Sequence, residues 1–364
     1  MSNTLCCCEF VDESGEMNHI LACCCNCQEL DLCCDRLISC QRVPSDLLMK
    51  VMIKSNDRLR IPWKGGARKF NKDAILPIFV LPLSLLWAAQ GWWMSVLIFP
   101  FMPLFLLYAH LLYMELYPQT YFFYVWNIAS TLVTCCVFEG VGVSLLEIRT
   151  DENIIFLILT IAVFFCIFKV RRLEKLSVVV NDVEDGDCLV NKVCSDCNIH
   201  IPLRAYHCHI CQACILKKNQ HCAWLNCCIG QSNHFWYIMF LVSNLSQLLL
   251  CSNLILTTAC HPFKVFGSPI MLPDDCSDVY FDSQYATCFV TAIYCLEVAI
   301  FIGAVLVHES WLISLGITGQ EYRNRSKRSG CYGLFMPRPF SKGFIRNWFM
   351  FWRGAYMAHS SYKI

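Results

Sequence analysis

The sequence has little charge of either sign and almost no excess of one sign over the other. Charged residues make up 16% of its 364 residues, and 29 basic against 28 acidic side chains leave a formal net charge of +1 at pH 7. This balance creates no global field for a polyanion, so nucleic acid is not an expected partner. The start, MSNTLCCCEF, lacks the pattern of a cleaved signal peptide, and Ser2 stands where myristoylation needs glycine, so neither feature is expected.

What the chain has in excess is apolar residues, which make up 56% of it and give a mean hydropathy of +0.46. This is far more apolar than soluble domains usually are, and it predicts an integral membrane protein. Nearly uncharged apolar segments predict about six transmembrane helices at residues 74–90, 92–112, 120–146, 153–170, 235–259 and 287–307. Glu139, the one intramembrane carboxyl that stands out, is expected to be a buried hydrogen-bonded group rather than a functional one, whereas a transporter or channel would carry several.

Basic residues indicate which side of the membrane each flank occupies. They gather before the first segment (Lys64, Arg68, Lys69, Lys72), after the fourth (Lys169, Arg171, Arg172, Lys175) and after the sixth (Arg323, Arg325, Lys327, Arg328). By the positive-inside rule these three flanks, and both termini, are expected in the cytosol. The predicted organisation is a cytosolic cysteine-rich segment 1–72, four helices in 73–170, a cytosolic domain 171–234, two helices with a lumenal loop in 235–307 and a cytosolic tail 308–364. In the lumenal loop, a disulfide between Cys260 and Cys276 and two unpaired thiols are equally open.

Most of the 28 cysteines lie in two polar stretches. The second, between the fourth and fifth segments, reads Cys194-x2-Cys197, His207-Cys208-x2-Cys211-x2-Cys214, His221-Cys222 and Cys227-Cys228. Cysteines two residues apart let one tight turn place two sulfurs on one zinc ion, and this stretch offers enough ligands for two ions. Structural disulfides are disfavoured in a cytosolic segment. The predicted fold is therefore an α-helical polytopic membrane protein with a small cytosolic domain that binds two zinc ions.

These cysteines and histidines except Cys227, together with Trp224, Asn226 and Gly230, resemble the cysteine-rich domain of DHHC protein S-acyltransferases. Thr318-Gly319-Gln320-Glu321 and Gly343-Phe344-Ile345-Arg346-Asn347 resemble two further motifs of that family. The resemblance implies one zinc on Cys194, Cys197, His207 and Cys214, and a second on Cys208, Cys211, His221 and Cys228. Both zincs would be structural, because four protein ligands leave no open position for a reactive water.

The resemblance also implies a reaction in which Cys222 takes a long-chain acyl group, such as palmitoyl, from acyl-CoA and passes it to membrane-proximal protein cysteines. Where the family reads Asp-His-His-Cys, this chain reads Asn219-Gln220-His221-Cys222. Asn219 and Gln220 can keep the hydrogen-bonded geometry, but Gln220 cannot accept a proton as a general base does. Because general-base catalysis contributes about 10² to 10⁴-fold, a weak enzyme is expected. The alternative is a catalytically impaired scaffold that binds clients or acyl-CoA.

Several other residues allow more than one interpretation of their role. His209 or His234 could replace the missing base, but a surface role for both is favoured. Lys217 and Lys218 could contact CoA phosphates or lipid headgroups, and Trp224 could line an acyl cavity or anchor the membrane interface. Ten cysteines in residues 1–40 could bind a metal with His19, be acylated, or form an unmodified tail. The compartment, among the ER, the Golgi and the plasma membrane, and a homo-oligomeric state are left open.

Overall fold

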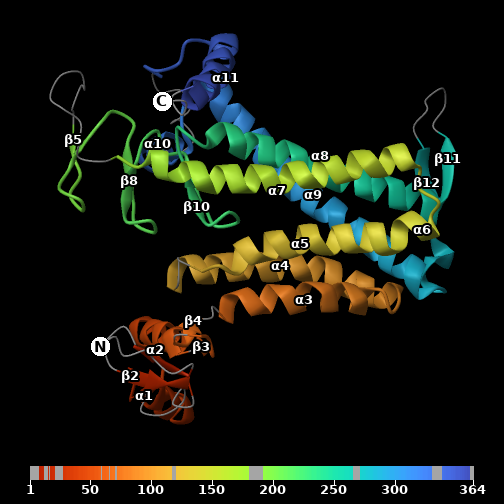
Figure 1. Cartoon of the computed structure of the whole chain (residues 1–364), viewed down its shortest axis with the longest axis horizontal. Helices are drawn as coiled ribbons and strands as arrows, with labels where there is room; N and C mark the ends of the chain where they lie inside the picture. Colours follow the sequence, from red (N-terminus) through yellow and green to blue (C-terminus); the bar gives the residue numbers. More distant parts are fainter. Residues whose placement is uncertain are drawn as a thin grey trace. The chain divides into compact units, whose positions relative to one another are not determined.

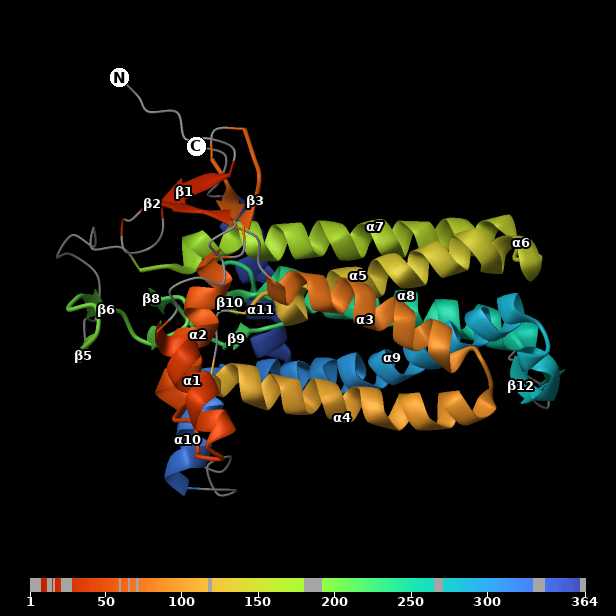
Figure 2. The ribbon, with the colours of Figure 1, turned by 90° about the horizontal axis from the view of Figure 1, so that it is seen from below.

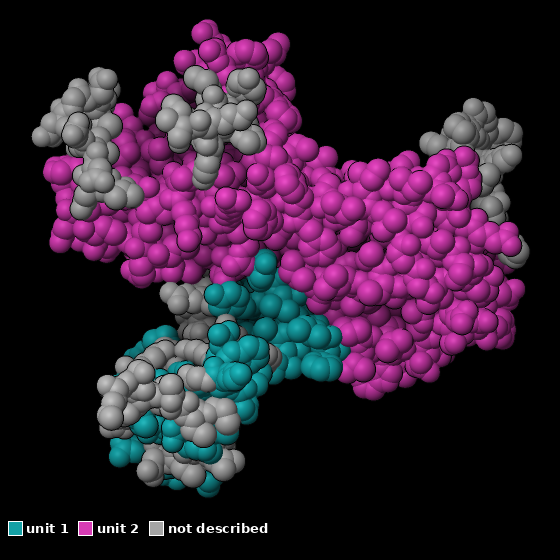
Figure 3. All heavy atoms as spheres, viewed as in Figure 1, with its two compact units in different colours: residues 1–80, 102–126 teal, residues 81–101, 127–364 magenta. Residues whose placement is uncertain are grey.

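The computed structural model describes residues 8–11, 15, 17–20, 28–58, 60–64, 66–69, 72–116, 120–179, 192–264, 271–329 and 338–360. They are mostly helical (Figure 1). The chain divides into two compact units, one of residues 1–80 with 102–126 and one of residues 81–101 with 127–364 (Figure 3). Most of the N-terminal cysteines, including Cys6, Cys7 and those of residues 23–27, lie outside the described residues, so the hypotheses about that segment stay untested.

The first unit begins with short elements that precede the apolar helices. They are β1 (Glu9–Val11), β2 (Met17–His19), α1 (Gln28–Ile38), α2 (Ser45–Arg58), β3 (Arg60–Ile61) and β4 (Arg68–Lys69), and β1 pairs with β2 and β3 with β4 in antiparallel fashion. At the start of the first apolar helix, Asp73 is buried and accepts a hydrogen bond of 3.0 Å from the Thr120 hydroxyl. Satisfying this carboxylate locally avoids the cost of an unpaired buried charge.

Apolar helices occupy the six segments that the sequence predicts. They are α3 (Lys72–Ala88), α4 (Trp92–Leu116), α5 (Phe122–Val137), α7 (Thr150–Leu173), α8 (His234–Ala259) and α9 (Ser283–Leu315), and α5 runs on through the π-helix η2 (Phe138–Gly142) into α6 (Val143–Leu145). Among the described residues, five are long and apolar enough to cross a membrane. The exception is α3, whose 17 residues lie at the lower limit for spanning a bilayer core, about 17 to 25 residues. The protein is a polytopic α-helical membrane protein.

The intramembrane carboxyls differ in part from the prediction. Glu139 lies in η2, where it is half-buried and its Oε2 accepts a hydrogen bond of 3.3 Å from the Asn153 side-chain amide, as expected, whereas its Oε1 is buried without a hydrogen-bond partner. The prediction that Glu139 is the one prominent intramembrane carboxyl is wrong, because Glu297 lies in the middle of α9. The residues around Glu297 are so apolar that the mean hydropathy of the segment stays high despite this carboxyl.

The last apolar helix is longer than the sequence predicts. The expected span ended near His308 and Glu309, whereas α9 continues to Leu315. Gly316 then ends the helix with a φ of +68°, a left-handed conformation that glycine adopts without a clash of a Cβ atom. Hydropathy marks where a helix leaves the apolar region, not where its hydrogen bonds stop. Glu309 therefore lies inside a helix, where its side chain is only 1% exposed.

Within the second unit, α8 packs against both α7 and α9, and Figure 2 shows it between them. Polar pairs cross between the helices: the Gln247 amide donates to the Thr160 hydroxyl at 2.8 Å, and the Tyr294 hydroxyl donates to Ser130 at 2.9 Å. Such hydrogen bonds and small side chains hold membrane helices together where the hydrophobic effect gives little preference.

The cysteine-rich segment folds into three antiparallel hairpins at one end of α7, α8 and α9 (Figure 1). The hairpins are formed by β5 (Lys192–Val193) with β6 (His200–Ile201), β7 (Tyr206–Cys208) with β8 (Ala213–Ile215), and β9 (Gln220–Cys222) with β10 (Cys227–Ile229). We call residues 192–233 the finger. Helices α10 (Gly319–Ser329) and α11 (Phe344–Ser360) lie at the same end. The finger has no large apolar core: its buried clusters consist of a few small aliphatic residues and of cysteines.

The opposite end of these helices carries the hairpin of β11 (His261–Lys264) and β12 (Met271–Asp275), followed by the 3-10 helix η4 (Ser277–Tyr280) (Figure 1). Cys260 and Cys276, which flank this hairpin, form a disulfide bond. Of the two readings that the sequence left open, the structure therefore has the disulfide.

Candidate active site and metal centres

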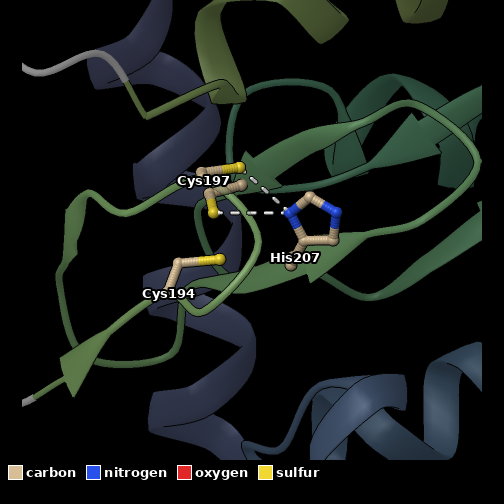
Figure 4. A group of neighbouring side chains, drawn as sticks. Cys194, Cys197 and His207 are labelled. Atoms are coloured by element: carbon tan, nitrogen blue, oxygen red, sulfur yellow. Dashed lines mark hydrogen bonds between the residues drawn. The ribbon is translucent and has the colours of Figure 1, made fainter.

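The first group of metal-ligating side chains consists of Cys194, Cys197, His207 and Cys214, whose ligand atoms all lie within 4.8 Å of one another. His207 and Cys214 face each other across the β7–β8 hairpin, and the turn after β5 brings the two remaining cysteines to them. His207 Nδ1 lies 3.2 Å from the Cys197 sulfur and 3.8 Å from the Cys214 sulfur. In Figure 4 the sulfurs of Cys194 and Cys197 lie on the side of the imidazole that carries Nδ1.

The second group consists of Cys208, Cys211, His221 and Cys228, also within 4.8 Å of one another. His221 Nδ1 lies 3.3 Å, 3.6 Å and 4.0 Å from the sulfurs of Cys211, Cys228 and Cys208. His221 and Cys228 are opposite each other in the β9–β10 hairpin. The Glu174 carboxylate accepts a hydrogen bond of 2.6 Å from the Cys228 N–H, so the 3-10 helix η3 (Glu174–Ser177), which follows α7, contacts this group.

The chemistry and spacing of both groups fit zinc. A tetrahedral ion with bonds of about 2.3 Å to sulfur and about 2.0 Å to nitrogen places its ligands roughly 3.5 to 3.8 Å apart. The separations of 3.2 to 4.0 Å around each imidazole scatter about that value. Each group offers three thiolates and one imidazole, a common donor set of structural zinc sites. Asp196 lies 4.0 Å from His207 Nε2, which is buried and has no hydrogen-bond partner among the described residues.

Cys222 belongs to neither group. It lies on β9, is 8% exposed and faces Cys227 across the hairpin. Burial raises the pKa of Cys222 to about 11, while backbone N–H groups of Leu225 and Trp224 act in the opposite direction. The Tyr237 hydroxyl on α8 also donates to the Cys222 sulfur and favours its thiolate. At neutral pH Cys222 is therefore a protonated thiol whose anionic form has hydrogen-bond donors ready.

Asn219 and Gln220 keep a hydrogen-bonded geometry around Cys222. The Gln220 amide Nε2 lies 3.1 Å from the Tyr237 hydroxyl and 3.2 Å from Glu309 Oε1. The Asn219 amide donates to Glu309 Oε2 at 2.8 Å. Gln220 thus connects the hydroxyl that contacts Cys222 with a carboxylate of α9. Glutamine cannot take up a proton at neutral pH, so this arrangement can orient groups but cannot act as a base at position 220.

His234 also lies in this network, whereas His209 does not. His234 Nε2 is 3.3 Å from Glu309 Oε2, and its side chain is 19% exposed. The expectation of a surface role for His234 is wrong, because the first turn of α8 points this residue toward α9. His209 is exposed, as expected.

The two motifs after α9 fasten the following chain to the finger and to α9. Glu321 accepts hydrogen bonds of 2.7 Å and 2.9 Å from the Arg204 guanidinium, which also donates to the Gly316 carbonyl. The Asn347 amide donates to the Ser314 carbonyl at 2.9 Å and so ties α11 to the end of α9. These contacts hold α10 and α11 at the end of the helices where Cys222 lies.

A sequence profile of the DHHC palmitoyltransferase family matches residues 189–326, which contain both ligand groups and Cys222. Palmitoyltransferase ZDHHC23 of Mus musculus is 26% identical over 400 residues, covering 95% of this chain and 92% of the relative. The Homo sapiens protein of that name is 27% identical over 369 residues, covering 87% and 88%. Palmitoyltransferase erf2 of Schizosaccharomyces pombe is 30% identical over 155 residues, covering 41% of each chain.

The residues predicted to meet acyl-CoA lie in different surroundings. The Trp224 ring is half-buried, with its centroid 6.0 Å from that of Phe301 on α9. Lys217 is exposed, whereas Lys218 is 8% exposed and donates to the His207 carbonyl at 2.9 Å. This bond favours a structural role for Lys218, and contact of the three residues with acyl-CoA stays a prediction.

Sequence reasoning missed Tyr237 and Glu309 as site residues. Tyr237 lies within the fifth predicted apolar segment, and Glu309 follows the end of the sixth. Tyr237 lies within α8 and Glu309 within α9, so neither is next to Cys222 in the sequence. A signal was present for Glu309, since a carboxyl that close to an apolar span is expensive unless it has partners.

Proposed function

We propose that this protein is a protein S-palmitoyltransferase that works through a thioester on Cys222. The observation that carries the proposal is a thiol left over from two complete four-ligand groups, held by the Tyr237 hydroxyl at one end of the apolar helices. The matched family profile and the names of the relatives support palmitoyl transfer and favour it over a scaffold without activity. Expected substrates are cysteines of proteins at the membrane surface.

The reaction has two balanced thioester exchanges. In the first, the Cys222 thiol loses its proton, its sulfur attacks the carbonyl carbon of acyl-CoA, and the CoA sulfur leaves and is protonated. In the second, the thiol of a protein substrate attacks the Cys222 thioester, and Cys222 leaves and regains a proton. Cys222 is thus nucleophile in one step and leaving group in the other, and donors that stabilise its thiolate assist both.

The backbone and Tyr237 provide those donors. The N–H groups of Trp224 and Leu225 and the Tyr237 hydroxyl are directed at the Cys222 sulfur. Gln220, which cannot accept the departing proton, holds the Tyr237 hydroxyl oxygen with its amide N–H and leaves the hydroxyl proton for the sulfur. Because a general base contributes about 10² to 10⁴-fold, we expect slower acylation than a site with histidine at position 220 would give.

The metal centres have a structural part in this proposal. Cys194, Cys197, His207 and Cys214 would hold one zinc, and Cys208, Cys211, His221 and Cys228 would hold another. When bound, the ions supply crosslinks and no reactive water, because protein ligands fill all four positions. His221 precedes Cys222 directly, so its coordination would fix the strand that carries the nucleophile.

We further propose that the finger faces the cytosol. Free zinc-binding thiols require a reducing compartment, and the Cys260–Cys276 disulfide forms in an oxidising one. The two features lie at opposite ends of α7, α8 and α9 (Figure 1), as expected if these helices cross the membrane between the two compartments. The basic flanks of the predicted spans support the same orientation.

Substitution of Cys222 tests the proposed function. Purified protein incubated with radiolabelled palmitoyl-CoA is expected to carry hydroxylamine-sensitive label, and Cys222→Ser is expected to remove it because an oxygen ester resists hydroxylamine and forms slowly. The measurement is label per chain, with the labelled peptide located by mass spectrometry. Cys227→Ser is the matched control, since Cys227 is the facing thiol and should leave labelling in place. Label that persists in Cys222→Ser would rule out Cys222 as the acyl carrier.

Substitution of Tyr237 tests how the thiolate is stabilised. A hydrogen bond to a charged group contributes about 1.5 to 3 kcal/mol, so Tyr237→Phe is expected to slow acylation of Cys222 by about tenfold or more. The measurement is the single-turnover rate of label incorporation. Tyr294→Phe is the matched control, because it also removes a buried hydroxyl, one that bonds Ser130. Equal rates for Tyr237→Phe and wild type would contradict a role of this hydroxyl in catalysis.

A further inference from the structure

Glu309 is a buried carboxylate that the reaction described above does not use. It lies on α9 near the end that carries the finger, and its side chain is 1% exposed. A buried carboxylate is costly unless several donors satisfy it. The surroundings of Glu309 show which donors those are.

Three side chains from two other elements point at the Glu309 carboxylate. The Asn219 amide donates at 2.8 Å and the Gln220 amide at 3.2 Å, both from the strand segment that leads to Cys222. His234 Nε2 lies 3.3 Å away on α8. His234 donates to this carboxylate in the tautomer that carries the proton on Nε2. Glu309 thus joins α8 and α9 to the strand next to the nucleophile.

Both polar atoms of the Asn219 amide have a partner, and one of these partners is the Glu309 carboxylate. Its Nδ2 donates to Glu309, whereas its Oδ1 accepts a hydrogen bond of 2.6 Å from the Gly319 N–H. An aspartate at position 219 could keep the second bond, but it would place two carboxylates in direct contact at a buried position. Like charges at that distance cannot both ionise without a large cost.

Gly319 and Arg323 of α10 complete the fit. A Cβ atom on Gly319 would approach Asn219 Oδ1 to 2.8 Å and the Asn219 carbonyl oxygen to 2.9 Å, so glycine is required for this close approach. The Arg323 guanidinium donates to the Asn219 carbonyl at 2.8 Å and interacts favourably with the charge of Glu309. The end of α10 therefore holds Asn219 in the orientation in which its N–H group faces Glu309.

We propose that Glu309 is a positioning residue for acyl transfer, which holds Gln220 against the Tyr237 hydroxyl that contacts Cys222, and that Asn219 and Glu309 form a matched amide–acid pair. This inference rests on the proposed function. The effect on Cys222 passes through two hydrogen bonds, from Glu309 to Gln220 at 3.2 Å and from Gln220 to the Tyr237 hydroxyl at 3.1 Å. The acid of this site comes from α9 and not from the strand that bears the nucleophile.

A charge exchange between the two positions tests the pair. Asn219→Asp should reduce the single-turnover rate of Cys222 acylation by about 10²-fold or more, because it brings two carboxylates together. Glu309→Gln alone should reduce it about tenfold, since one carboxamide oxygen cannot serve both amide donors. The double variant Asn219→Asp with Glu309→Gln restores one acid and one amide, and its rate should return to within about tenfold of wild type.

Concentration dependence and a second glutamate separate positioning from folding. Glu309→Gln should lower the maximal rate of labelling and leave the half-saturating concentration of palmitoyl-CoA unchanged. Glu297→Gln, on the same helix but outside the network, should leave both unchanged. Wild type without label would overturn the proposed function and the positioning role together. An active wild type in which the double variant is as slow as the product of the two single effects would overturn only the inference about Glu309.

Discussion

Replacing Cys228 with alanine is expected to remove one zinc ion per chain and to abolish palmitoylation. Cys228 is one of four ligands in the second group, and its strand pairs with the strand that carries Cys222. Structural zinc supplies about 10 to 16 kcal/mol of apparent binding free energy in small zinc-binding peptides, and the buried clusters of the finger are too small to replace it. The finger should therefore unfold while the apolar helices remain helical.

Zinc content and limited proteolysis measure this effect. We expect two zinc ions in wild type, one or none in Cys228→Ala, and new protease cleavage within residues 192–233. Cys227→Ala is the matched control, because the neighbouring cysteine is equally buried but belongs to neither ligand group. An unchanged zinc content in Cys228→Ala would contradict the assignment of the second group. Zinc bound to Cys227→Ala should equal that of wild type.

The second large effect is expected from Gln220→His, which should accelerate acylation of Cys222 by about 10²-fold. The side chain at position 220 lies between the Tyr237 hydroxyl and Glu309 Oε1, at 3.1 Å and 3.2 Å. An imidazole there would gain a proton acceptor on one nitrogen and a carboxylate to orient the other, as in nucleophile–histidine–acid sites. The measurement is the single-turnover rate of label incorporation at neutral pH.

Two comparisons decide how a gain in Gln220→His is read. Gln231→His, which places a histidine at an exposed position of the finger, should give no gain. Adding Glu309→Gln to Gln220→His should remove most of the gain if Glu309 orients the new imidazole. An unchanged rate in Gln220→His would show that loss of the base does not limit this protein. Label in Gln220→His together with none in wild type would support the impaired scaffold.

Much of the architecture could be predicted from local sequence patterns. Apolar runs predicted the helices. A segment that crosses the lipid must be continuously apolar, and its backbone must form its hydrogen bonds internally. The ends were less predictable: α9 runs past Glu309 to Gly316, since helix hydrogen bonds continue where hydropathy falls. The cysteine spacing indicated metal binding, because two residues between ligands is the distance that one tight turn covers.

The division of ligands between two ions needed more than spacing. Cys208 follows His207 directly, yet the two belong to different groups, because neighbouring residues on strand β7 point to opposite faces. The resemblance to the DHHC family implied this division, and the structure brings the same residues together. Ligand occupancy and the role of Cys222 stay proposals for the experiments above.

By itself the sequence predicted a membrane protein with six apolar segments, a cysteine-rich finger with the spacing of metal ligands, and Cys222 as the proposed nucleophile. It also showed that Asn219 and Gln220, three and two residues before Cys222, cannot act as acid or base. Only the tertiary structure decided that Glu309, Tyr237 and His234 surround those residues, and that Cys260 and Cys276 form a disulfide. Contacts between α8, α9 and β9 join residues far apart in the chain. Packing and side-chain hydrogen bonds decide which face of a helix meets the finger. The sequence of an almost uniformly apolar helix does not distinguish its faces, so it cannot predict this contact.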